Sequence, residues 1–257
     1  MLYMNDIIKS KDNDKIKQTA KLLKSASYRN ETGLLALEGV RLCIDAIQSG
    51  AECVYMFYTQ KAALKIDEFI NENSYEVRED VFEKISDTKT SQGVVCVFKC
   101  RDIDFIIDKN GKYIALENIN DPANLGAIAR TAEALGINGI VILGECCDIH
   151  NPKALRASMG AILRLPVLKT DCESFISMCK KNGIKTYAAA LTKHAVPINE
   201  ADFTKGSCVL IGNEANGLQS STIESCDFSV VIPMNDNANS LNAAAAAAVF
   251  AFAMKNI

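Results

Sequence analysis

The strongest constraint on this fold is a regular alternation of short apolar segments with helical segments. In the second half of the chain, apolar segments typical of strands lie at 113–117, 139–143, 186–190, 208–211 and 228–232. Each has a turn-forming or polar residue within two positions of its end. A helix is predicted at 124–135, with Gly136 after it. Because strands alternate with helices, this half is predicted to be an α/β domain with a parallel sheet.

The first half shows the same alternation. Strands are predicted at 34–38, 54–58 and 93–98, and helices at 14–25, 40–47 and 62–70. A charged stretch, 101–111, ends in the turn-forming pair Asn110-Gly111 and separates the halves. With a length of 257 residues, we expect two domains, 1–103 and 104–257, the first a small α/β domain.

The composition excludes several classes of protein. With 49% hydrophobic and 23% charged residues, the chain is typical of a globular protein rather than a disordered one. The longest apolar run, 243–254, is shorter than the roughly 20 residues that cross a bilayer, and the N-terminus has no apolar signal-peptide core. We therefore expect a cytoplasmic protein without a membrane span, whose ten cysteines are reduced thiols.

The charge is unevenly distributed along the chain. The net charge of −3 excludes a wholly basic nucleic-acid binder, but the first 30 residues carry +4 and the remainder −7. This basic segment is either a solvated helix face or a surface that contacts phosphate. Both interpretations stay open from the sequence.

Three polar segments, 120–130, 211–217 and 232–242, follow predicted strands of the second half. Because the carboxyl ends of parallel strands lie at one edge of a sheet, we expect the three segments to meet there. Each alone has a purely structural explanation, with Asn124 or Ser240 as a helix cap and Gly212 as a turn residue. Together, their amide, guanidinium, carboxylate and hydroxyl groups favour a ligand site.

The three segments resemble the signature motifs of the SpoU-type (TrmH-like) RNA 2′-O-ribose methyltransferases of the SPOUT superfamily. The first, NDPANLGAIARTAEALG, contains the family's Asn-x-Gly-x-x-x-Arg-Thr core. The second is VLIGNEANGL, and the third, IPMNDNANSLNAAAAAA, matches at Ile-Pro-Met and Ser-Leu-Asn. In the first half, LALEGVRLCIDAIQSG and ISDTKTSQGVVCVF resemble the family's substrate-binding domain, which is similar to small ribosomal RNA-binding proteins. The resemblance covers roughly residues 30–257.

The resemblance implies S-adenosyl-L-methionine as methyl donor, without a metal, and a ribose 2′-hydroxyl of structured RNA, rRNA or tRNA, as acceptor. It implies that the C-terminal domain is a trefoil-knotted parallel sheet and forms a homodimer. The last helix, predicted at 239–254, also favours a dimer, because an all-apolar helix needs cover from other helices or a second subunit. The alternatives are a catalytically weak or inactive RNA-binding or ribosome-assembly protein that retains the fold, and a different α/β nucleotide-binding enzyme.

The resemblance also implies roles for individual residues. The catalytic set is Arg130, Asn124, Glu214, Ser240 and Asn242. The donor-binding set is Gly212, Ile232, Met234 and Leu241, with Leu191 just past a predicted strand.

Arg130 is expected at the acceptor, as a base or as a phosphate clamp, and the high pKa of a free guanidinium favours the clamp. Asn124 is expected to position Arg130 or the substrate, and Glu214 to orient Arg130 or bind the donor's ammonium group. Ser240 and Asn242 are expected to line the methyl-transfer site.

The chain departs from the family pattern in the third motif. Asn239 stands where the family often has Glu, and 235–237 stand where it often has glycines. Loss of that carboxylate bears on substrate positioning and gives weight to the inactive alternative. The only two histidines, His150 and His194, have no second histidine nearby and are expected to be structural or surface residues.

Overall fold

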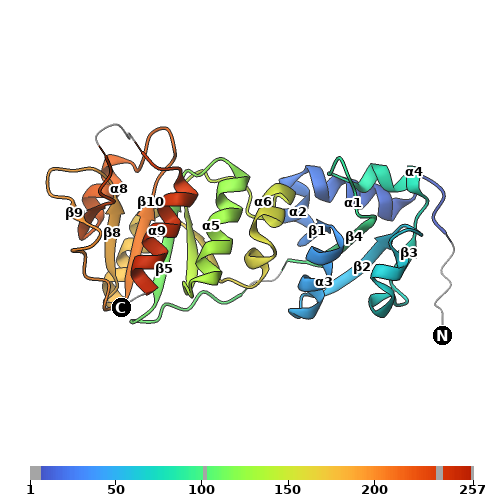
Figure 1. The fold of residues 1–257 in the computed structure, drawn as a ribbon, viewed down its shortest axis with the longest axis horizontal. Helices are drawn as coiled ribbons and strands as arrows, with labels where there is room; N and C mark the ends of the chain where they lie inside the picture. Colours follow the sequence, from blue (N-terminus) through green and yellow to red (C-terminus); the bar gives the residue numbers. More distant parts are fainter. Residues whose placement is uncertain (1–6, 101–102, 236–239, 256–257) are drawn as a thin grey trace. The chain divides into compact units, whose positions relative to one another are not determined.

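The computed structural model describes residues 7–100, 103–235 and 240–255, and the chain divides into two compact units. The first unit comprises Met1–Asp102 and His150–Leu163, and the second comprises Ile103–Ile149 and Arg164–Ile257 (Figure 1). The sequence boundary assigned the segment His150–Leu163 to the C-terminal domain. It belongs to the first unit because its helix α6 (Pro152–Ser158) packs against a strand of that unit.

A four-stranded sheet forms the centre of the first unit. Its strand order is β1 (Leu34–Glu38), β4 (Val94–Lys99), β2 (Cys53–Tyr58) and β3 (Ser74–Glu76). The β1–β4 and β4–β2 pairs are antiparallel, and β2–β3 is parallel. The three longer strands were predicted to within one residue at each end, whereas β3 was not predicted.

The helices of the first unit are short, and one of them was predicted wrongly. Besides α6, they are α1 (Asp14–Lys24), α2 (Ala26–Thr32), α3 (Val40–Gln48), α4 (Glu79–Phe82) and the 3-10 turns η3 (Glu83–Ile85) and η4 (Ala161–Leu163). The predicted helix at 62–70 is two 3-10 turns, η1 (Ala63–Lys65) and η2 (Asp67–Phe69). Only Ala62 and Ile66 of this segment are buried, so it has no continuous apolar stripe to support an α-helix.

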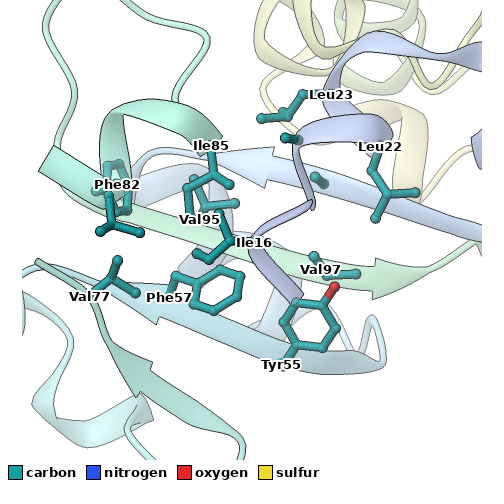
Figure 2. Close-up of a cluster of buried hydrophobic side chains, with 13 residues drawn as sticks. Ile16, Leu22, Leu23, Tyr55, Phe57, Val77, Phe82, Ile85, Val95 and Val97 are labelled. Atoms are coloured by element: carbon teal, nitrogen blue, oxygen red, sulfur yellow. The ribbon is translucent and has the colours of Figure 1, made fainter. Parts of the chain in front are cut away.

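The core of the first unit lies between α1 and the sheet. Figure 2 shows Ile16, Leu22 and Leu23 of α1 packed against Tyr55 and Phe57 of β2 and against further side chains from β4 and the 77–85 segment: Val77, Phe82, Ile85, Val95 and Val97. The side chain of Asn13 caps α1 by accepting hydrogen bonds from the backbone N–H groups of Lys15 and Ile16.

The second unit is built on a seven-stranded sheet in which all neighbours are parallel. The order across the sheet is β7 (Val167–Thr170), β6 (Gly139–Leu143), β5 (Lys112–Glu117), β10 (Ser207–Ile211), β8 (Lys185–Ala189), β11 (Phe228–Val231) and β9 (Val196–Pro197). The predicted parallel α/β sheet is therefore confirmed. Strand β10 is inserted between β5 and β8, so segments distant in sequence become neighbours.

The helices of the second unit are α5 (Pro122–Ala134), α7 (Cys172–Asn182), α8 (Ser220–Ser225) and α9 (Ala243–Lys255). Helices α5 and α9 pack on each other, and α9 also contacts β5 and β10 (Figure 1). Helix α7 packs with α8 and buries Phe175 and Ile176 against the sheet. Helix α9 buries one face, and its Phe252 is 61% exposed, so part of this apolar helix is exposed within the described residues.

Three further features of the structure concern its thiols, possible metal ligands and apolar helices. All ten cysteines are free thiols. Within the described residues, no group of three or more His, Cys, Asp or Glu side chains is arranged to hold a metal ion. No helix of the described part combines the length and the apolar character that a membrane crossing requires.

Candidate functional site

The three polar segments meet at one edge of the parallel sheet. Asn124, in the first turn of α5, donates a hydrogen bond from Nδ2 to Glu214 Oε1. Asn242, just before α9, donates from Nδ2 to Asn124 Oδ1 at 3.0 Å. One carboxamide therefore links all three segments, as expected for loops that follow parallel strands.

Asn124 and Ser240 are not the caps of their helices. Asp121 caps α5 by accepting a hydrogen bond from the N–H of Ala123 at 2.9 Å. Asn242 caps α9, with its Oδ1 accepting from the N–H of Ala244 at 2.9 Å. The capping explanation for Asn124 and Ser240 is therefore wrong, and the Asn124 amide is free to make contacts between loops.

The loop after β10 is closed tightly on itself. Asn213 Oδ1 accepts from the N–H of Ala215 at 2.8 Å, and the carbonyl of Asn213 accepts from the N–H of Gly217 at 2.8 Å. A Cβ at Gly212 would lie 2.1 Å from the carbonyl carbon of Gly217, which is far inside van der Waals contact. Only glycine fits at Gly212, so this residue sets the shape of the loop that carries Glu214.

A cavity of about 420 Å³ opens beside this loop, at the ends of β8, β10 and β11 and next to α9. Seven of the ten predicted site residues line it: Leu191, Gly212, Glu214, Ile232, Met234, Ser240 and Leu241. Phe250 of α9, Ala189 at the end of β8 and the following Ala190 are among its other wall residues. Its volume lies within the roughly 300–1,000 Å³ of pockets that hold small organic ligands.

The comparisons with known proteins decide the family. Residues 111–252 match the profile of the SpoU rRNA Methylase family, and residues 13–96 match that of an MRM3-like substrate binding domain. The chain belongs to the SpoU rRNA methylase family. It is a methyltransferase of the SpoU type.

Curated relatives of this SpoU methylase cover between two thirds of its length and nearly all of it. A 23S rRNA (guanosine(2553)-2′-O)-methyltransferase of Bacillus subtilis, RlmP, is 27% identical over 248 residues, which are 96% of this chain and 98% of that protein. A mitochondrial rRNA methyltransferase 3 of Xenopus tropicalis is 34% identical over 68% of this chain and 45% of its own length.

Solved structures of SpoU methylases have the same fold. An AdoMet-bound rRNA methyltransferase from Sinorhizobium meliloti is 29% identical, with a TM-score of 0.86 and coverage of 97% of both chains. AviRb from Streptomyces viridochromogenes in complex with AdoMet is 25% identical, with a TM-score of 0.82 and coverage of 94% of this chain and 97% of that one.

The remaining predicted residues of the SpoU site lie outside the cavity wall. Asn124 is hydrogen-bonded directly to Glu214 of the cavity wall, and Asn242 is hydrogen-bonded to Asn124. Arg130 is exposed on α5, six residues beyond Asn124, and does not line the cavity. Within the described residues, Arg130 makes no hydrogen bond or ion pair. Asn239 and 236–238 lie outside the described residues.

The sequence analysis did not single out two residues, Glu117 and Asn118, that hold the chain in and after the loop that follows β10. Glu117, at the end of β5 and only 3% exposed, accepts hydrogen bonds from the N–H of Gln219, at 2.7 Å, and from the hydroxyl of Thr222. Asn118, with a φ of 57°, offers its carbonyl to Asn213 Nδ2 at 2.9 Å. The signal for Glu117 was its carboxylate at the end of an apolar strand. A carboxylate buried at such a position needs hydrogen-bond donors around it.

A larger hollow of about 690 Å³ lies between α7 and α8. It is lined by residues of these two helices, such as Lys180 and Thr222, and by residues at the ends of β5 and β6, such as Glu117 and Leu143, but by none of the ten predicted site residues. Size alone therefore does not distinguish the two hollows. The junction of the three motifs makes the smaller one the candidate site.

Proposed function

We propose that the protein transfers a methyl group from S-adenosyl-L-methionine to a ribose 2′-hydroxyl of structured RNA, with rRNA favoured over tRNA. The observation that carries the proposal is the junction of Asn124, Glu214 and Asn242 beside a cavity lined by backbone groups and apolar side chains. Two solved structures of the same fold hold AdoMet. Several curated relatives are named as 23S rRNA 2′-O-methyltransferases.

The cavity fits the chemistry of this donor. Its walls combine apolar side chains, such as Ile232 and Leu241, with the backbone of the Gly212 loop, which suits an adenosine. Glu214 is the carboxylate on the wall, and it can accept a hydrogen bond from the donor's ammonium group. When bound, the donor supplies an electrophilic methyl group and needs no Lewis acid.

The residues must position the acceptor and assist loss of its proton. In the transfer, the ribose oxygen would form a bond to the methyl carbon as the carbon–sulfur bond breaks; the sulfur would keep the electron pair and leave as S-adenosylhomocysteine, and the hydroxyl proton would pass to solvent water. Asn124 is held from both sides, so Glu214 is held in a fixed position beside the cavity. Arg130 is proposed to clamp the adjacent phosphate and stabilise negative charge that develops on the oxygen.

The functional unit is proposed to be a homodimer formed through the C-terminal domain. Phe252, at 61% exposed, and Val249, at 38%, are large apolar side chains of α9 that keep exposed surface. A second subunit packed on α9 would cover both side chains. With rRNA or tRNA as substrate, we place the protein in the cytoplasm, where ten free thiols stay reduced.

The trefoil knot and the role of the first unit belong to the same proposal. The knot rests on membership of the SpoU family, and the described residues on both sides of 236–239, Ile232, Met234, Ser240 and Leu241, line the cavity together with the ends of β8 and β10. Residues 1–103 are proposed to bind the RNA substrate, which the profile match of 13–96 supports.

The proposal is tested by donor binding and methyl transfer together. We expect S-adenosylhomocysteine to bind the purified protein in calorimetry, and rRNA from a strain lacking the gene to accept a labelled methyl group on one ribose. That ribose should be methylated in the parent strain and unmethylated in the deletion strain. Tight RNA binding without transfer would favour the inactive RNA-binding alternative, and no affinity for S-adenosylhomocysteine would contradict the donor.

A further inference from the structure

The first unit contains a hollow near the beginning of the described chain. Residues 7–10, the start of α1 and Tyr75 of β3 enclose a groove of about 590 Å³, lined by Ile7, Ile8, Lys9, Ser10, Asn13, Asp14, Lys15 and Tyr75. One wall is paired to the sheet edge, because the N–H of Ile8 donates to the carbonyl of Glu76 at 2.9 Å. The groove is therefore built from ordered backbone on both sides.

A lysine is held against two aromatic rings in this groove. The ammonium of Lys15 lies 4.6 Å from the ring centroid of Tyr55 and 5.2 Å from that of Tyr75. Tyr55 belongs to the buried core in Figure 2, and Tyr75 is half-buried. Cation–π contacts fix the ammonium at this place, and within the described residues Lys15 makes no ion pair. The positive charge of Lys15 is therefore held at a fixed place without a carboxylate to neutralise it.

The other groove residues define the chemistry of an occupant. Lys9 is exposed and adds a second ammonium, while Ile7, Ile8 and the ring of Tyr75 provide apolar surface. Asp14 provides a carboxylate, which accepts hydrogen bonds from amino or imino groups and repels a bare anion. An anionic group joined to a flat, apolar ring with N–H donors satisfies all of these residues. A nucleotide has that combination.

We propose that this groove binds one unpaired nucleotide of the RNA substrate, with its base on Tyr75 and its phosphate at Lys15 and Lys9. The proposal rests on the RNA substrate proposed above. A base must be unstacked from its neighbours to lie on a tyrosine ring, so the groove selects a single-stranded or bulged nucleotide over a continuous duplex. The proposal also decides between the two interpretations of the basic N-terminal segment, because it makes that segment a surface that contacts phosphate.

The groove is tested with the full-length protein and a fluorescein-labelled decauridylate as probe, followed by fluorescence anisotropy. Tyr75→Ala should weaken binding about tenfold, since stacking on one aromatic residue contributes roughly 1–3 kcal/mol. Tyr75→Phe keeps the ring and should bind within twofold of the parent protein. Lys15→Gln should weaken binding and reduce the slope of log K against log salt by about 0.7, the value for one phosphate contact on a single strand.

Two controls separate the groove from other causes. Lys99→Gln removes an exposed lysine of the same unit that does not line the groove, and it should bind like the parent protein. A blunt RNA duplex of the same length should bind more weakly than decauridylate and should be insensitive to Tyr75→Ala. Equal sensitivity of duplex and single strand would overturn the proposal, as would affinities of Tyr75→Ala and Lys15→Gln that stay within twofold.

Photo-crosslinking keeps the test valid even if Tyr75→Ala does not fold. Decauridylate carrying one 5-iodouridine should crosslink to Tyr75 in the otherwise unchanged protein, and crosslinks confined to other parts of the chain would overturn the proposal. Methyl transfer is measured separately. Loss of transfer with a retained Tyr75 crosslink would contradict the proposed function while supporting the groove.

Discussion

The side chain of Asn242 donates a hydrogen bond to Asn124 Oδ1 at 3.0 Å, although 118 residues separate them in the sequence. Asn124 in turn donates to Glu214, so its carboxamide is used in both directions. Because Asn242 also caps α9, the start of that helix and the Glu214 loop are connected through one amide. The arrangement makes the geometry of Glu214 dependent on Asn124.

The first prediction concerns this amide. Asn124→Asp replaces the donating NH₂ group by a carboxylate oxygen beside the carboxylate of Glu214, and like charges at hydrogen-bond distance repel. We expect kcat/KM for methyl transfer to fall at least tenfold. The matched control is Asn216→Asp, which introduces the same charge at an exposed position of the neighbouring loop. If the two variants lost activity equally, a specific role for Asn124 would be excluded.

The second prediction concerns Gly212. In Gly212→Ala the new methyl group would overlap the backbone at Gly217, so the loop must open. Because the loop lines the cavity, affinity for S-adenosylhomocysteine should fall more than tenfold in calorimetry. Asn216→Ser, at an exposed position of the same loop that does not line the cavity, should bind normally. Unchanged affinity in Gly212→Ala would show that donor binding does not depend on the shape of this loop.

Much of the second unit was predictable from local sequence signals. Strand β6 was predicted at its observed bounds, and the helix that became α5 was placed within two residues at each end, with Gly136 as the signal for its end. Strand β7 was missed, since it carries Lys169 and Thr170 and no fully buried residue. The two-residue strand β9 has too few residues for any periodicity to be detected.

The site was predictable as a meeting of segments but not as a set of contacts. The sequence motifs brought Asn124, Glu214 and Asn242 to one edge of the sheet. Which atoms bond depends on tertiary packing, since Asn242 became the cap of α9 in place of Ser240. The orientation of the Arg130 side chain also depends on tertiary packing, because its position on a helix does not tell which part of the protein it faces.

The third prediction concerns Arg130. Arg130→Ala should abolish methyl transfer, by at least a hundredfold in kcat, while affinity for S-adenosylhomocysteine stays within a few-fold, because Arg130 does not line the donor cavity. Arg130→Lys should recover only part of the rate, since it keeps the charge but loses the planar fork that grips a phosphate. Normal turnover by Arg130→Ala would contradict the assigned role.

The fourth prediction uses the proposed dimer. Because Arg130 does not line the cavity of its own chain, we expect it to serve the cavity of the partner subunit. A heterodimer of an Arg130→Ala subunit and a Gly212→Ala subunit then keeps one intact site and about half the activity. If Arg130 served its own chain, both sites would be defective and the heterodimer inactive.

The dimer itself is tested by Phe252→Glu, on the exposed face of α9, which should shift the protein to monomer in light scattering.

The last prediction concerns Glu38, which is buried in the first unit. Its carboxylate accepts hydrogen bonds from the hydroxyls of Ser86 and Thr88 and from the N–H of Asp87, each at 2.6 Å. Burial alone would raise the pKa of Glu38, but these hydrogen bonds together outweigh it and the pKa is lowered from 4.5. Glu38 therefore fixes the 86–88 segment in its charged form.

The sign of the effect on stability follows from the lowered pKa. The contribution of Glu38 is fully present above its unfolded pKa, near 4.5, and is lost as the pH falls through the folded value. Glu38→Gln should lower the free energy of unfolding by about 2 kcal/mol at pH 7, as expected for hydrogen bonds to a charged group. The difference from the parent protein should shrink as the pH falls below 4.5, and urea denaturation at pH 7 and pH 3 measures both. Glu83→Gln, at an exposed carboxylate of the same unit, should change neither value appreciably. A pH-independent cost of Glu38→Gln would mean that shape rather than charge fixes the 86–88 segment.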